Sequence, residues 1–142
     1  MTRESILDTS LNGRVALITG GSKGLGLAMA KAYFSHGAKV ALLARGADDL
    51  IAAEAQIRDM AIADEHRASA AVASFVCDVI DPIASHDTHA QVVEKLGNVD
   101  ILINNAGQSA AKPFVKISDE EWQADLDLKL MAAVRLTRLV WP

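Results

Sequence analysis

The segment TGGSKGLG at residues 19–26 restricts the fold of this chain more than any other part of the sequence. The apolar, β-branched run RVALIT (residues 14–19) leads into it, and residues 25–36 carry small and apolar side chains at helical spacing until Gly37. We therefore predict a strand, a glycine turn, a helix and a glycine stop, which together form the first half of a βαβ unit.

Glycines in such a turn suit the binding of a phosphate. A helix N-terminus offers backbone N–H groups to an anion, and side chains in the turn would hold a pyrophosphate away from them. We predict that Gly20 makes the tight turn off the strand, Gly24 lets the phosphate approach, and Gly26 lets the helix pack closely on the sheet. A plain tight turn between strand and helix is the alternative interpretation.

The rest of the sequence continues the alternation of strand and helix. Apolar runs predict four strands, at residues 14–19, 39–44, 71–77 and 99–104, and helical patterns occupy residues 25–36, 48–63, 82–96 and 118–140. Strands that are apolar on both faces are typical of parallel sheets covered by helices on both sides. The expected fold class is α/β, a doubly wound parallel sheet (Rossmann fold) with only the first four strands and their helices present.

Composition and charge exclude several function classes. The net charge of −4 comes from mixed acidic and basic residues, so no basic stripe for nucleic acid and no polybasic arm for a membrane is predicted. Cys77 is the single cysteine, and the N-terminus shows no signal pattern, so we expect a reducing, cytoplasmic setting. His86 and His89 lie three apart without a third ligand, and no metal site is predicted.

Three motifs in register give the chain a family resemblance. TGGSKGLG matches Thr-Gly-x-x-x-Gly-x-Gly, Asp78 lies in VCDVID after the third predicted strand, and NNAG at residues 104–107 follows the fourth. The chain after residue 12 resembles the short-chain dehydrogenase/reductase family. The resemblance implies the following cofactor-binding set: Thr19, Gly20, Ser22, Lys23, Gly24, Leu25, Gly26, Arg45, Asp78, Val79, Asn105, Ala106 and Gly107.

The positions of Asp78 and the NNAG segment along the chain also favour ligand binding on physical grounds. Both follow the carboxyl ends of predicted strands, where open α/β sheets bind ligands. The carboxylate of Asp78 is able to accept a hydrogen bond from an exocyclic amine such as that of adenine. The alternatives are an ordinary helix or turn cap for Asp78, and for Asn104 and Asn105 a turn that satisfies its own backbone.

The charge that follows the second strand favours NADP(H) over NAD(H). An NAD site usually has an acidic residue about 20 residues past the glycines, at the ribose 2′-hydroxyl. Here that place holds Ala44 and Arg45, and Lys23 adds a second positive charge from the glycine turn. Arg45 and Lys23 therefore predict a clamp for a 2′-phosphate. The alternative is that both are solvated surface residues.

The family resemblance implies a serine, a Tyr-x-x-x-Lys pair and an asparagine for hydride transfer. Tyr33 is the only tyrosine and belongs to the first helix, so the serine and tyrosine motif would lie beyond Pro142. Lys129 occupies the asparagine position. Two explanations for Lys129 stay open, a role in the proton relay and an ion pair with Asp125 one helical turn away.

The last helix, residues 118–140, carries two apolar stripes and therefore has two faces to bury. The stripes contain Trp122, Leu126, Ala133, Leu136 and Val140 on one side and Leu128, Ala132 and Leu139 on the other, leaving Gln123, Asp127, Arg135 and Arg138 as the polar side. We expect one face to cover the sheet and the other a partner, either a second copy in a homo-oligomer or a companion segment with the missing strands. Ser118 and Glu121 predict a capping box at its start.

Taken together, the sequence predicts a lead-in at residues 1–13 and an NADP-binding Rossmann domain at residues 14–142, truncated before strand five. By resemblance, the chain is the cofactor-binding part of an NADP(H)-dependent oxidoreductase that acts on a small carbonyl or alcohol and is inactive alone. A non-catalytic NADP-binding sensor or assembly module is the alternative. The sequence does not specify the substrate.

Overall fold

The structure is a computed structural model that describes residues 10–109 and 111–142, so most of the predicted lead-in lies outside the described residues. Four parallel strands form one sheet in the order β3-β2-β1-β4. Their bounds are Val15–Thr19 for β1, Lys39–Ala44 for β2, Ala71–Val76 for β3 and Ile101–Ile103 for β4. The predicted parallel sheet is confirmed, and because all four strands are parallel, their carboxyl ends lie at one edge.

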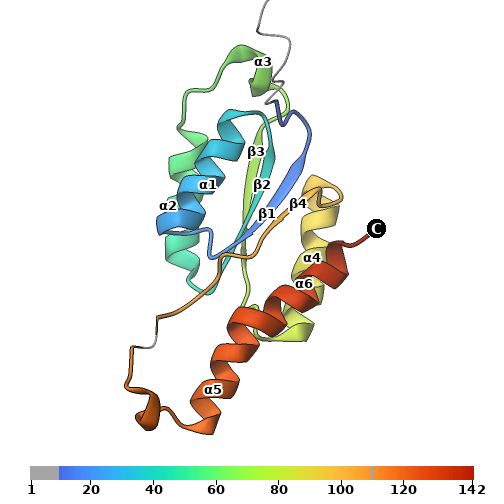
Figure 1. Cartoon of the computed structure of the whole chain (residues 1–142). Coiled ribbons are helices and arrows are strands. Elements are labelled where there is room, and N and C mark those ends of the chain that lie inside the picture. The colour runs from blue at the N-terminus through green and yellow to red at the C-terminus, as the bar shows by residue number, and fades with distance from the viewer. Residues whose placement is uncertain (1–9, 110) are drawn as a thin grey trace, which may run out of the picture.

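Helices cover both faces of this sheet, as the apolar strands predicted. Figure 1 shows α1 (Gly24–Ser35) and α2 (Ala47–Arg58) on one face, and α4 (Pro82–Leu96) with α6 (Ala132–Val140) on the other. Successive residues of β1 point to opposite faces, because Ile18 packs with α1 and α2 while Leu17 packs with α4 and α6. Burying one such side chain contributes about 1.5–3 kcal/mol.

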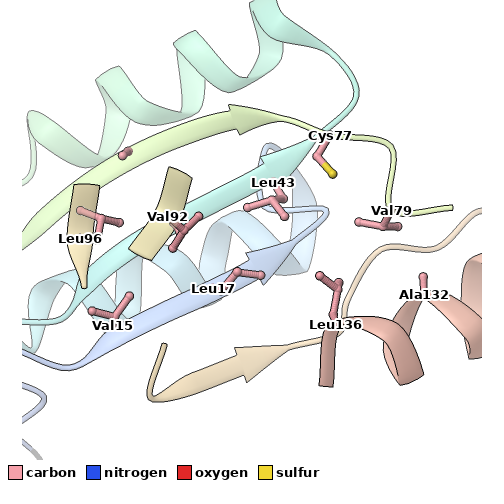
Figure 2. Packing of buried hydrophobic residues seen from close by; sticks show 11 residues of the cluster. Val15, Leu17, Leu43, Cys77, Val79, Val92, Leu96, Ala132 and Leu136 are labelled. Carbon is pink, nitrogen blue, oxygen red and sulfur yellow. The ribbon is translucent and has the colours of Figure 1, made fainter. Parts of the chain in front are cut away.

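The core on the α4 and α6 face lies directly behind the edge where the strands end. In Figure 2, Leu17 of β1 and Leu43 of β2 lie on the same side of the sheet as Val92 of α4. Leu136 of α6 joins them and is almost completely buried. The last helix is therefore fixed to the sheet close to the segment that follows β3. The predicted division between the two stripes is wrong, because Leu136 of one stripe and Ala132 of the other pack on the same core cluster.

Two predicted boundaries are wrong. The helix predicted at residues 48–63 ends at Arg58, after its last buried residue Ile57, and a separate one-turn helix α3 covers Asp64–Arg67. Between these helices the chain returns toward β3, and Met60 and Ile62 still pack on the core. The fourth strand is also shorter than predicted, because only Ile101–Ile103 pair with β1.

The helix predicted at residues 118–140 is present but contains an unpredicted irregularity. It consists of α5 (Asp119–Leu126), a π-helical turn η3 (Asp127–Met131) and α6, and it follows a 3₁₀ turn η2 (Phe114–Lys116). Ser118 and Glu121 form the predicted capping box. A side chain also caps α4, since Asp81 accepts from the backbone amides of Ile83 and Ala84, and Pro82 is the first residue of this helix.

One face of this long helix packs on the sheet and another does not. Leu136 is buried, whereas Trp122, Leu126 and Leu130 are 41%, 46% and 54% exposed. Arg135, predicted on the polar side, is half-buried, because its guanidinium donates to the carbonyl oxygen of Ile80 at 3.1 Å. None of the helices in the described part of the chain is long and apolar enough to span a membrane.

Candidate cofactor-binding site

The three glycines of the turn after β1 have the conformations that a close approach requires. Gly20 and Gly24 adopt positive φ angles of 64° and 52°, which glycine tolerates best. A Cβ on Gly26 would lie 2.3 Å from the carbonyl oxygen of Gly20, so any side chain there would force the turn and α1 apart. Gly26 thus permits a close approach, as predicted, but the neighbours are the turn at Gly20 and the side chain of Asn105 instead of the sheet.

The N-terminus of α1 is open to an anion. Its N-cap residue, Lys23, is extended and makes no side-chain capping hydrogen bond, and the first turn contains no acidic residue. A helix start of this kind presents backbone N–H groups and the positive end of the helix dipole. The turn therefore fits the pyrophosphate of a dinucleotide.

Buried hydrogen bonds tie this turn to the segment after β4. The hydroxyl of Thr19 donates to the carbonyl oxygen of Ile103 and accepts from the backbone amides of Asn105 and Ala106 at 3.0 and 2.9 Å. The side-chain amide of Asn105 donates to the carbonyl oxygens of Thr19 and Gly20. The side chains of Thr19 and Asn105 thus hold the turn in shape.

A cleft of about 450 Å³ lies at the carboxyl edge of the sheet. It is lined by Gly20, Ser22, Lys23, Gly24, Leu43, Ala44, Arg45, Gly46, Asp49, Cys77, Asp78, Val79, Ile80, Asn105, Ala106, Gly107, Gln108 and Leu128. The structure thus brings most of the predicted cofactor-binding residues around one space. Of the others, Thr19 and Gly26 form the turn behind the cleft, and Leu25 is exposed.

Lys23 of the β1–α1 turn and Arg45 of the β2–α2 turn both line this cleft, and we call the part of the cleft that they line the cationic corner. Sequence reasoning missed a third charged group there. The ammonium of Lys23 forms an ion pair with Oδ2 of Asp49, at 2.7 Å. Asp49 belongs to the first turn of α2, four residues after Arg45, and this proximity in sequence was the only signal that could have revealed it.

Asp78 lies exposed on the wall of the cleft, after β3. One of its carboxylate oxygens accepts from the backbone amide of Ile80 at 3.1 Å, so the turn cap considered as the alternative is present. The carbonyl oxygen of Ile80 in turn accepts from Arg135 of α6. This contact anchors the loop that carries Asp78 and Val79 to the long helix.

Lys129 lies in the π-helical turn, outside the main cleft. Its ammonium pairs with Oδ1 of Asp125 at 2.8 Å, so the ion pair considered from the sequence is present. Lys129 also borders a small cavity of about 20 Å³ next to Thr19 and Asn104. Tyr33 is packed against the core cluster under α1 and α2, away from this cavity.

Acidic and metal-ligating side chains do not gather at the cleft in a way that suggests a metal. Among the residues that the structure describes, no group of three or more histidine, cysteine, aspartate or glutamate side chains could hold a metal ion. His86 is exposed on α4 beside Asp87, and His89 is partly buried.

Comparison with known proteins agrees with this geometry. The profile of the family described as short chain dehydrogenase matches residues 14–142. The mouse (Mus musculus) 15-hydroxyprostaglandin dehydrogenase (NAD(+)) is 35% identical over 91% of the chain, which covers 43% of that protein. D-threitol dehydrogenase from Mycolicibacterium smegmatis is 32% identical over 94% of the chain and 48% of its own length.

Solved structures give the same result. L-Sorbose reductase from Gluconobacter frateurii, in complex with NADPH and L-sorbose, matches with a TM-score of 0.83 and 34% identity over 94% of the chain and 48% of the reductase. A metagenomic short-chain oxidoreductase in complex with NADP matches with a TM-score of 0.79 and 33% identity, over 92% and 56%. The chain thus spans about half the length of these proteins, whose names include both NAD(+) and NADP(H).

Proposed function

The chain belongs to the short-chain dehydrogenase family, and we propose that it is the cofactor-binding part of an NADP(H)-dependent oxidoreductase that acts on a small carbonyl or alcohol. The observation that carries this proposal is the single cleft that joins the open N-terminus of α1 to the cationic corner of Lys23 and Arg45. The NADPH and NADP complexes among the similar structures support it.

Each part of the cleft has a separate task in this proposal. The backbone amides at the start of α1 bind the pyrophosphate, because the glycine turn leaves them accessible. Lys23 and Arg45 bind the 2′-phosphate, for which the planar guanidinium is well suited. Asp78 accepts from the adenine amine. The bound nicotinamide supplies hydride transfer to or from the substrate carbon.

The second candidate function is an NADP-binding module without catalysis, and the state of Lys129 favours it. Lys129 occupies the place of the family's asparagine, but its ammonium is engaged by Asp125. Apart from the choice between these two functions, the single tyrosine of this chain, Tyr33, packs on a core cluster instead of lining the cleft. We therefore expect this chain alone to show no reductase activity with NADPH, whichever function the whole protein has.

Calorimetric titration of NADPH and NADH into the chain tests the proposed function. We expect NADPH to bind about tenfold more tightly or better, since a charge-assisted contact contributes about 1.5–3 kcal/mol. Arg45→Asp should narrow or reverse this difference. Arg67→Asp is the control, because Arg67 lies in α3 at the far end of the sheet (Figure 1). Equal affinities for the two cofactors would contradict the proposal.

The predicted homo-oligomer through residues 118–140 is also part of the proposal. Trp122, Leu126 and Leu130 form an exposed apolar face on the long helix, and such faces commonly pack against a second subunit. Sedimentation velocity should show a dimer or larger species that Leu126→Glu converts toward monomer. A monomer at all concentrations would contradict this.

A further inference from the structure

The ion pair at the cationic corner places a carboxylate of the protein where an anionic ligand is expected. Oδ2 of Asp49 lies 2.7 Å from the ammonium of Lys23. The same oxygen is the atom that a Cβ on Gly46 would meet first, at 3.1 Å, so the carboxylate folds back over the start of α2. Gly46 is the N-cap of α2 and provides no side-chain cap.

Two interactions hold the charge of Asp49 at this place. One is the ion pair with Lys23, and the other is the positive end of the α2 dipole, because Asp49 lies in the first turn of that helix. Both side chains remain accessible from the cleft, with Lys23 71% and Asp49 49% exposed. A phosphate that approaches Lys23 therefore meets a carboxylate already bound to it.

We propose that Asp49 is an internal competitor for the 2′-phosphate of NADP(H) and sets how strongly the cleft prefers NADP(H) to NAD(H). This inference rests on the proposed function, in which Lys23 and Arg45 bind that phosphate. Binding of NADP(H) separates Lys23 from Asp49, whereas binding of NAD(H), which lacks the phosphate, leaves the pair intact. Asp49 thereby lowers the affinity for NADP(H) selectively.

The neighbouring aspartate provides a matched control. Asp48 precedes Asp49 in the same first turn of α2 and carries the same charge. Asp48 does not line the cleft, and within the described residues it forms no ion pair. A general effect of negative charge near the cleft would appear with either residue, whereas competition for Lys23 is specific to Asp49.

The test is a double-mutant cycle of Lys23→Met and Asp49→Asn, with NADPH and NADH titrated by calorimetry at low ionic strength. We expect Asp49→Asn to tighten NADPH binding about two- to fivefold, the range that corresponds to an exposed ion pair. The NADH affinity should stay within about twofold of the unmutated chain, and Asp48→Asn should change neither. In the Lys23→Met background, Asp49→Asn should have no further effect on NADPH.

Several results would overturn the inference. NADPH affinity that is unchanged in Asp49→Asn, or that rises equally in Asp48→Asn, would exclude specific competition. An equal gain with and without Lys23 would show that the ion pair is not involved, and weaker NADH binding would make Asp49 a ligand of the ribose instead. These outcomes leave the proposed function intact, whereas failure of the unmutated chain to prefer NADPH would reject both.

Discussion

The glycine turn after β1 and the cationic corner beside it border the same cleft but are built in opposite ways. The turn is defined by backbone conformation and buried hydrogen bonds, with Gly26 against Gly20 and Thr19 bonded to the amides after β4. The corner consists of exposed, charged side chains, among them Lys23 and Asp49. We expect the rigid glycine turn to bind the pyrophosphate, which both cofactors contain. We expect the exposed side chains of the corner to bind the 2′-phosphate, which only NADP(H) contains.

This difference implies that the two regions respond differently to mutation. Changes in the turn should affect the stability of the fold together with the binding of either cofactor. Changes in the corner should leave stability nearly unaltered, because exposed ion pairs contribute only about 0–1 kcal/mol. They should alter only the preference between cofactors.

The largest effect is expected for Gly26→Ala. The added Cβ would overlap the carbonyl oxygen of Gly20, and we expect the free energy of unfolding to fall by an amount at the upper end of the range of about 1–3 kcal/mol that is typical of overpacking, with loss of NADPH and NADH binding. Gly24→Ala is the control, since its Cβ meets open space and only the positive φ opposes it, at about 1–2 kcal/mol. Urea unfolding should separate the two variants, and equal stabilities would show that the turn is not tightly packed.

The next largest effect is expected for Thr19→Val. The change leaves the amides of Asn105 and Ala106 without their acceptor, at a cost of about 1–3 kcal/mol for a buried group. Thr19→Ser retains the hydroxyl and should recover most of this stability. If Thr19→Val is as stable as Thr19→Ser in urea, the hydrogen bonds of the Thr19 hydroxyl do not stabilise the fold as proposed.

A smaller effect, the dependence of cofactor affinity on salt concentration, distinguishes the cationic corner from the glycine turn. Raising the ionic strength from about 0.1 M to about 1 M shortens the Debye length from about 10 Å to about 3 Å. We expect NADPH affinity to fall several-fold more than NADH affinity, because only NADPH places a phosphate at the exposed cations. Parallel losses for both cofactors in calorimetry would mean that the corner does not distinguish them.

The smallest effect concerns His89 on α4, outside both regions. Partial burial, and repulsion from His86, hold the pKa of His89 below its ordinary value of 6.5. The folded state therefore binds this proton less well than the unfolded state, and stability should decline as the pH falls below about 6.5. His89→Asn should weaken this decline in urea unfolding at a series of pH values. If the stability of His89→Asn falls with pH as steeply as that of the unmutated chain, the lowered pKa of His89 is not the cause of the decline.

The contrast between the two regions also explains what the sequence could predict. The conformations of Gly20 and Gly24 and the tight contact of Gly26 follow from local sequence, because a strand, a turn and a helix in succession need them. Asp49 could not be predicted as the partner of Lys23, since this ion pair depends on how two separate βα turns are placed in space. Asp49 lies just behind the predicted Arg45, yet exposed side chains have many alternative partners.

The last helix gives a second example of this limit. Its capping box and apolar character were predicted, and Leu136 is buried against the sheet. The π-helical turn at Asp127–Met131 was not predicted, because one extra residue per turn hardly changes a pattern of short apolar spacings. Nor could the sequence show that Arg135 donates to Ile80, a contact between segments far apart along the chain.

A crystal structure of the chain with bound NADPH is the decisive test of how the cofactor is bound. We expect the pyrophosphate to lie at the N-terminus of α1, the 2′-phosphate to contact Lys23 and Arg45, and the ion pair between Lys23 and Asp49 to be broken. A 2′-phosphate bound away from these two cations, with Lys23 still paired to Asp49, would contradict this expectation.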